Sequence, residues 1–105
     1  MSGTLQCSDS VTMTNEKGTG EDDCPCGSWI EHWSNHSGVS GVITCFVLGC
    51  KKVATDGAHV TLDHVAKKSG GFRTFIAPMC HEHNCQFGQD FQAKPNSVFV
   101  RVGSD

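Results

Sequence analysis

Apolar and polar positions divide the chain into a polar first fifth and a longer part with regular patterns. Residues 1–22 are rich in Ser, Thr, Asn, Gly and acidic side chains, with almost no regularly spaced apolar ones. A segment of this kind buries too little apolar surface to offset the entropy that it loses on ordering. We therefore expect a disordered acidic and polar tail over residues 1–22 and one folded domain over residues 23–105.

The patterns beyond residue 23 predict two helices and several strands. Ser28-Trp29-Ile30-Glu31 is a capping-box sequence, so we expect a short helix from about residue 29 to residue 36. Pro78 and Gly88 would bound a second helix. Runs of β-branched and aromatic residues predict strands over residues 42–48, 58–62, 72–76 and 97–102. The expected fold class is a small α+β domain, whose sheet consists of a hairpin and a final strand.

Length and composition indicate that this domain needs disulfide bonds or a bound metal ion for stability. The chain has 105 residues, of which 37% are hydrophobic and seven are cysteines, and so small a domain rarely forms a sufficient core alone. Its start has neither the basic region nor the apolar run of a signal peptide, and no stretch approaches the ~20 apolar residues of a membrane span. We therefore expect an intracellular, reduced protein whose cysteines bind metal, with Cys7 as a free thiol in the tail. A secreted, disulfide-stapled protein with a host-defence or ligand-binding role is the alternative.

Two pairs of potential metal ligands stand about thirty residues apart. Cys45 and Cys50 form the first pair, and Cys80 and His83 form the second. Four nitrogen and sulfur ligands in two close pairs are typical of a tetrahedral Zn²⁺ site. Cys85 competes with His83 for the fourth position, but a three-residue spacing on a helix aligns side chains better than a five-residue spacing does. We therefore predict a structural zinc ion bound by Cys45, Cys50, Cys80 and His83.

A second group of potential ligands lies near the start of the expected domain. Cys24, Cys26 and His32 fall within a stretch of nine residues, and His36 or His59 would complete a tetrahedron. Because His32 also fits an ordinary exposed position of a helix, the sequence leaves open whether the protein binds one zinc ion or two.

The order of a turn with two ligands, a hairpin, and a helix start with two ligands resembles the treble-clef zinc finger over residues 45–88. The resemblance implies that the first ligand pair, Cys45 and Cys50, comes from a knuckle. It also implies that the second pair, Cys80 and His83, comes from the first turn of a helix. Four residues separate the two knuckle cysteines, where two are usual in the family.

Part of the same stretch is similar to nucleases of the HNH type, which share this scaffold. The similar segments are Gly57-Ala58-His59-Val60, Ile76-Ala77-Pro78-Met79-Cys80 and His83-Asn84. The similarity implies that His59 is the general base that activates water, and that His83 or Asn84 positions a divalent ion. Residues 72–76 lack the asparagine that is usual before the second ligand pair. We therefore expect a binding module without a catalytic residue and keep a nuclease as the alternative.

The uneven distribution of charge bears on the partner. The net charge is −3, and the basic residues of the middle segment are Lys51, Lys52, Lys67, Lys68 and Arg73. These residues would form a weak basic patch for nucleic acid, whereas an acidic chain as a whole is not drawn strongly to a polyanion. We expect a monomeric module that binds a macromolecule, with a protein partner favoured over nucleic acid and no contact with a membrane.

Overall fold

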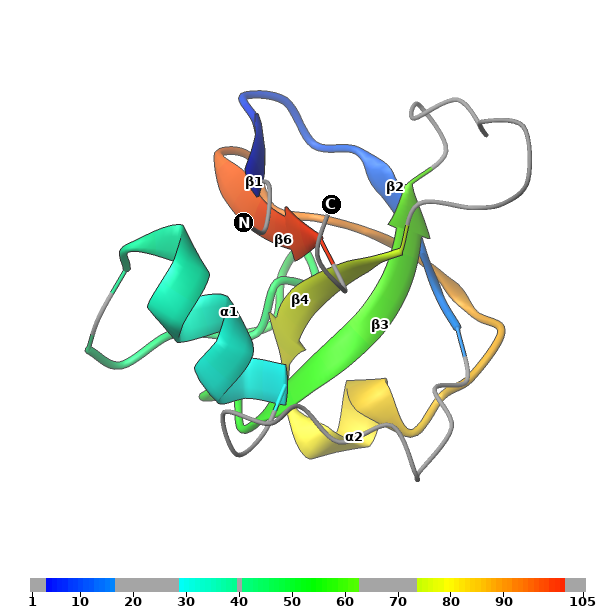
Figure 1. Cartoon of the computed structure of the whole chain (residues 1–105). Helices are drawn as coiled ribbons and strands as arrows, with labels where there is room; N and C mark the ends of the chain where they lie inside the picture. The colour runs from blue at the N-terminus through cyan, green and yellow to red at the C-terminus, as the bar shows by residue number, and fades with distance from the viewer. Residues whose placement is uncertain (1–3, 17–28, 40, 63–73, 102–105) are drawn as a thin grey trace.

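The computed structural model describes residues 4–16, 29–39, 41–62 and 74–101. Within these residues, six strands form one antiparallel sheet and two helices lie against it (Figure 1). The strands are β1 (Thr4–Cys7), β2 (Thr12–Asn15), β3 (Asp56–Leu62), β4 (Phe75–Met79), β5 (Asp90–Gln92) and β6 (Ser97–Arg101), and the helices are α1 (Trp29–Ser37) and α2 (His81–Asn84). The order across the sheet is β1-β6-β4-β3-β2-β5, so the first and last strands pair with each other. The expected α+β class is confirmed.

Helix α1 packs across the sheet and closes the hydrophobic core. Trp33 of α1 is 2% exposed, and its ring meets Phe46 edge to face with centroids 5.7 Å apart. Phe46 meets Phe99 of β6 in the same way, and each such pair adds about 1 kcal/mol beyond the burial of area. Gly57 of β3 lets the helix approach this closely, because a Cβ atom there would lie 2.5 Å from the backbone nitrogen of Ile30.

The elements with the clearest local patterns are confirmed. The helix predicted over residues 29–36 is α1, and the strands predicted over residues 58–62 and 97–102 are β3 and β6, with shifts of one or two residues at their ends. β4 pairs with β3 as the predicted hairpin requires, but it extends to Met79, and Pro78 lies inside it opposite Gly57. The second helix is therefore shorter than predicted and begins only after Cys80. Neither of the described helices has the length and apolar character needed to cross a membrane.

The N-terminal segment is ordered over residues 4–16, so the predicted disorder is wrong for this part of the tail. β1 pairs with β6, and β2 lies between β3 and β5. Met13 of β2 is fully buried, and Cys7 lies in the core with 8% of its surface exposed. Strands of four residues carry too little local pattern to be recognised, because their stability comes from pairing with distant segments. Residues 1–3 and 17–22 of the predicted tail lie outside the described residues.

Residues 42–48 do not form the predicted strand. Their ladder contacts are two isolated bridges, from Thr44 to Val53 and from Val47 to Ala93. Gly49, with a φ of 87°, turns the chain back instead. The sequence also gave no sign of β5, a strand of three residues beside β2.

Candidate metal centre

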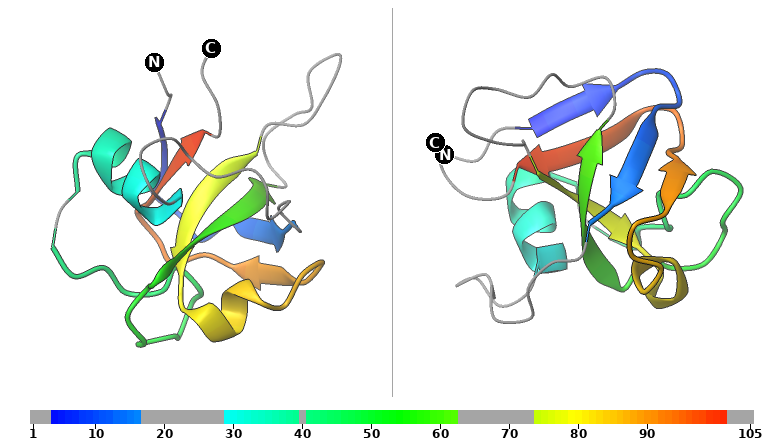
Figure 2. Two further views of the ribbon diagram at one scale, coloured as in Figure 1. Left: turned by 60° about the horizontal axis from the view of Figure 1, so that its bottom comes forward. Right: turned by 90° about the vertical axis from the view of Figure 1, so that its right-hand side faces the viewer.

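Two segments that are far apart in the sequence bring the four predicted ligands together. The first is residues 43–54, called the metal loop below, which folds back on itself through backbone hydrogen bonds. The Cys45 amide donates to Lys52 O at 2.9 Å, and the Ala54 amide donates to Ile43 O at 2.8 Å. The second segment is the start of α2, which lies beside the β3–β4 hairpin (Figure 2).

The local structure of each segment fixes its two ligands. In the metal loop the Cys50 amide donates to Val47 O at 2.9 Å, and this turn returns Cys50 toward Cys45. Cys80 is the residue that precedes α2, with an extended backbone, and His83 lies within the helix. A spacing of three residues at the start of a helix places both side chains on one face.

The four candidate ligand atoms lie close together. The atoms of Cys45, Cys50, Cys80 and His83 all lie within 4.8 Å of one another. His83 Nδ1 is 3.5 Å from Cys45 Sγ and 3.2 Å from Cys80 Sγ, and a sulfur and a nitrogen bound to tetrahedral zinc stand about 3.6 Å apart. The described part of the chain holds no other group of three such ligand residues. These four residues therefore form a group that can bind a metal ion.

Burial and hydrogen bonding act in opposite directions on two of the thiols. Burial raises the pKa of Cys45 to about 11, because a thiolate there would have little contact with water. The pKa of Cys50 is lowered, chiefly because the backbone N–H of Lys52 donates to its sulfur. Metal-bound cysteines are thiolates, so a metal ion that enters this group must displace protons from the thiols.

Asn15 of β2 holds the end of α2 in place. This side chain is fully buried, and its Nδ2 donates to His83 O at 3.2 Å, to Asn84 O at 2.9 Å and to Gln86 O at 3.0 Å. The last carbonyls of a helix lack partners within it. His83 O also accepts from the Gln86 amide at 3.1 Å, and the Asn15 amide adds donors for Asn84 O and Gln86 O. Asn15 Oδ1 is buried and has no hydrogen-bond partner among the described residues. Sequence reasoning missed Asn15, because nothing in its polar surroundings marks it as buried.

A second polar group on α2 faces β3 rather than the metal ligands. Asp56 Oδ2 lies 2.7 Å from His81 Nδ1 and accepts a hydrogen bond from Asn84 Nδ2 at 3.0 Å. Partial burial would raise the pKa of Asp56, but the hydrogen bonds from His81 and Asn84 hold it below its usual value. Cys85 Sγ lies 3.4 Å from His81 Nε2, and Cys85 is not part of the four-ligand group. The structure therefore places His83, and not its competitor Cys85, beside the other three ligands.

Two of the histidines considered for a second metal site, His32 and His59, contact Trp29, and the third, His36, contacts His32. The Trp29 ring meets the His32 ring at 5.3 Å and the His59 ring at 4.9 Å, and the His36 ring lies 4.5 Å from that of His32. The predicted sulfur ligands Cys24 and Cys26 lie outside the described residues. A second zinc site therefore stays a prediction.

The predicted basic patch and the nuclease residues are only partly described. Lys51 and Lys52 are exposed, and Lys52 pairs with Glu82 of α2, while Lys67, Lys68 and Arg73 lie outside the described residues. An ion pair between two side chains this exposed adds little to stability. Asn84, one of the two residues that the nuclease alternative offers for an ion, donates to Asp56. His59 belongs to no group of three metal-ligand residues within the described ranges.

No protein-family model matches this chain, and no curated protein or solved structure matches it.

Proposed function

We propose that this protein is a structural zinc module of the treble-clef type that binds another protein. The observation that carries the proposal is the convergence of three cysteines and one histidine from two distant segments. Three sulfurs and one imidazole nitrogen form a donor set that favours Zn²⁺ over the harder Mg²⁺ and Ca²⁺ ions. The sequence of elements supports the treble-clef assignment: the metal loop comes first, the β3–β4 hairpin second, and Cys80 and His83 at the start of α2 last.

A structural role for the metal follows from the number of protein ligands. Four protein ligands fill a tetrahedral zinc site, and no position is left for a water molecule that could react. The metal would instead join the metal loop to α2, two segments with little regular structure of their own. Since such a site does not exist in the unfolded chain, the binding free energy of the metal contributes to folding.

The described cysteines favour metal over disulfides. Cys45, Cys50 and Cys80 are all unbridged although their sulfur atoms are close together. This arrangement supports a reduced protein and weighs against the alternative of a secreted, disulfide-stapled protein.

A protein partner is supported by the exposed surface of the metal loop. Its apolar side chain Val53 is 53% exposed, and Val42 beside the loop is 81% exposed. A net charge of −3 does not favour a nucleic acid partner. The nuclease alternative has less support, because Asn84 donates to Asp56 and His59 belongs to no group of three metal-ligand residues among the described ones.

Replacement of zinc by Co²⁺ tests the proposed site, because thiolate ligands and tetrahedral geometry give Co²⁺ characteristic absorption bands. We expect the purified apo-protein to bind Co²⁺ with the intense bands of a tetrahedral thiolate site, and Zn²⁺ to displace it. Cys80→Ser should weaken these bands, whereas the matched control Cys85→Ser should leave them unchanged. Equal effects of the two variants, or bands typical of octahedral Co²⁺, would refute the assignment.

A further inference from the structure

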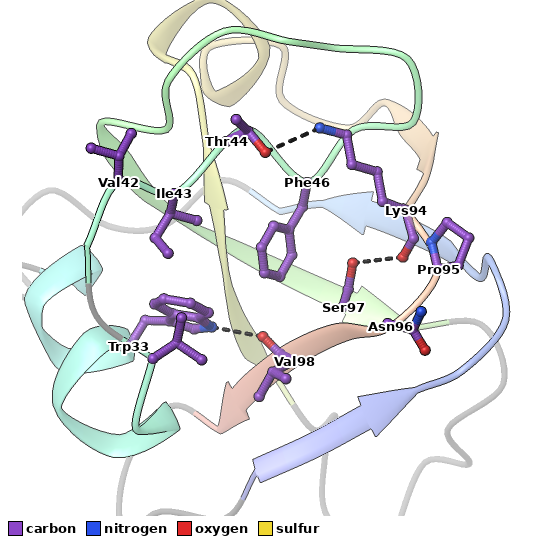
Figure 3. Close-up of a pocket in the computed structure, with 11 residues that line it drawn as sticks. Trp33, Val42, Ile43, Thr44, Phe46, Lys94, Pro95, Asn96, Ser97 and Val98 are labelled. Carbon is purple, nitrogen blue, oxygen red and sulfur yellow. Dashed lines mark hydrogen bonds between the residues drawn. The ribbon is translucent and has the colours of Figure 1, made fainter.

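An open pocket lies next to the metal loop, between α1 and the turn that joins β5 to β6 (Figure 3). Its volume is about 290 Å³. Trp33 and Phe46 form its aromatic side, and Val42 and Ile43 stand opposite the Lys94 side of the pocket. A volume of this size is near the lower limit of small-ligand sites, and it suits one large side chain of a partner better than an extended ligand.

The interior of the pocket favours an apolar group. The Trp33 indole N–H donates to Val98 O at 2.7 Å, and the Ser97 hydroxyl donates to Lys94 O at 2.6 Å. Because these polar groups are already hydrogen-bonded within the protein, most of the surface that remains for a ligand consists of aromatic rings and aliphatic side chains, with Thr44 and Asn96 as further polar lining residues.

The rim of the pocket carries a single charge. Among the described residues, Lys94 is the only charged one that lines the pocket, and none of the acidic ones does so. Lys94 Nζ donates to Cys50 O at 2.5 Å and to Thr44 Oγ1 at 3.4 Å. An ammonium group has three N–H donors, so one remains for a ligand. A carboxylate next to the apolar group would complement this charge, and a second cation would be repelled.

The metal loop forms one side of the pocket. Thr44 and Phe46 line it and are the two neighbours of the metal ligand Cys45. The carbonyl that holds Lys94 belongs to Cys50, a second ligand, and the Lys94 amide donates to Phe46 O at 2.9 Å. A metal ion that fixes Cys45 and Cys50 therefore also fixes the groups that shape the pocket.

We propose that this pocket is the docking site for an acidic peptide segment of a partner protein. An aliphatic or aromatic side chain of the segment would enter the pocket against Trp33 and Phe46, and a neighbouring carboxylate would accept a hydrogen bond from Lys94. This inference rests on the proposed function, since it names the partner chemistry and the surface that the zinc module presents.

Peptide titration of the zinc-loaded full chain tests this proposal. The probes are acetyl-EELFEE-amide, its basic counterpart acetyl-KKLFKK-amide, and acetyl-EESGEE-amide, which lacks the apolar anchor. Binding is followed by NMR through the indole N–H signal of Trp33, with the indole signal of Trp29 as the reference. We expect saturable shifts at Trp33 with the acidic apolar peptide, and affinities at least tenfold weaker for the other two peptides.

Variants at an exposed position distinguish binding in the pocket from general electrostatic attraction between the peptide and the protein. Val42 is 81% exposed, so Val42→Glu should leave the fold intact and weaken the acidic peptide at least tenfold, whereas Val42→Lys should not weaken it. Leu48→Glu adds the same charge outside the pocket, and we expect its affinity to stay within about threefold of that of the unmodified chain. Equal losses in Val42→Glu and Leu48→Glu, or equal binding of the acidic and basic peptides, would overturn the proposal.

Zinc content of the same samples distinguishes the failure of this inference from the failure of the proposed function. If the protein carries zinc and no peptide shifts the Trp33 signal, the docking site is refuted and the zinc module stands. A chain that contains no zinc under any loading condition refutes the proposed function itself. A short RNA that shifts the Trp33 signal when the acidic peptide does not would also overturn the docking proposal.

Discussion

Replacement of Asn15 by leucine should weaken zinc binding, although Asn15 is not a ligand. Asn15→Leu keeps a side chain of similar size and removes the amide that donates to His83 O, Asn84 O and Gln86 O. His83 O keeps the Gln86 amide as a donor at 3.1 Å, so Asn84 O is the carbonyl that loses its donor. A buried carbonyl left without a donor costs about 1–3 kcal/mol. The carbonyl of Gln86, an exposed residue, can turn to water, and the variant also removes the buried, unpartnered Oδ1.

These effects together give a net loss of about 2 kcal/mol in the stability of the end of α2. Because zinc binding requires His83 in its helical position, the metal must supply this energy if the segment is disordered in the apo-variant. A penalty of about 2 kcal/mol corresponds to a zinc affinity roughly 30-fold weaker.

The assay is a competition between the protein and a chromophoric zinc chelator at constant pH. Thr14→Val is the matched control, because it removes an exposed hydrogen bond to Asp90 from the same strand, with a donor–acceptor distance of 2.7 Å. We expect the control to retain its zinc affinity within about threefold. If Asn15→Leu also stays within about threefold, or if both variants lose affinity equally, Asn15 does not position the metal ligands.

Three further results are expected. Gly57→Ala should destabilise the protein by about 1–3 kcal/mol in urea unfolding, because the added Cβ would lie 2.5 Å from the backbone of α1. Unchanged stability would show that α1 lies farther from β3. Chelation of zinc should move amide NMR signals of the metal loop and α2 more than those of β1 and β6; uniform changes would show that the metal does not act through these two segments. In the apo-protein the free energy of unfolding should fall as the pH rises from about 9 to about 11. The reason is that the pKa of the Cys45 thiol is about 11 in the folded chain and lower in the unfolded one. Cys45→Ser should remove this part of the pH dependence, and an identical profile in Cys45→Ser would exclude burial of the thiol as its cause.

The candidate ligands could be identified from the sequence because the members of each pair are only a few residues apart. Cys80 and His83 are three residues apart at a helix start, and Cys45 and Cys50 flank the turn at Gly49. Such short-range patterns can be recognised without knowledge of the tertiary fold. The same holds for α1, whose capping box and spaced tryptophans are local features.

Features that depend on distant pairing could not be predicted. The four residues of β2 are polar apart from Met13, and the strand exists because β3 and β5 flank it on both sides. The role of Asn15 likewise depends on carbonyl groups nearly seventy positions away in the sequence. Lys94 belongs to the same class, since its contact with Cys50 O is visible only after the sheet has formed.

Native mass spectrometry of the reduced, purified chain tests the central claim most directly. The proposal predicts a mass that corresponds to the polypeptide plus zinc, with a zinc ion retained in Cys85→Ser and lost in Cys80→Ser. A metal-free, folded chain whose mass is lowered by the hydrogens lost on disulfide formation would contradict it.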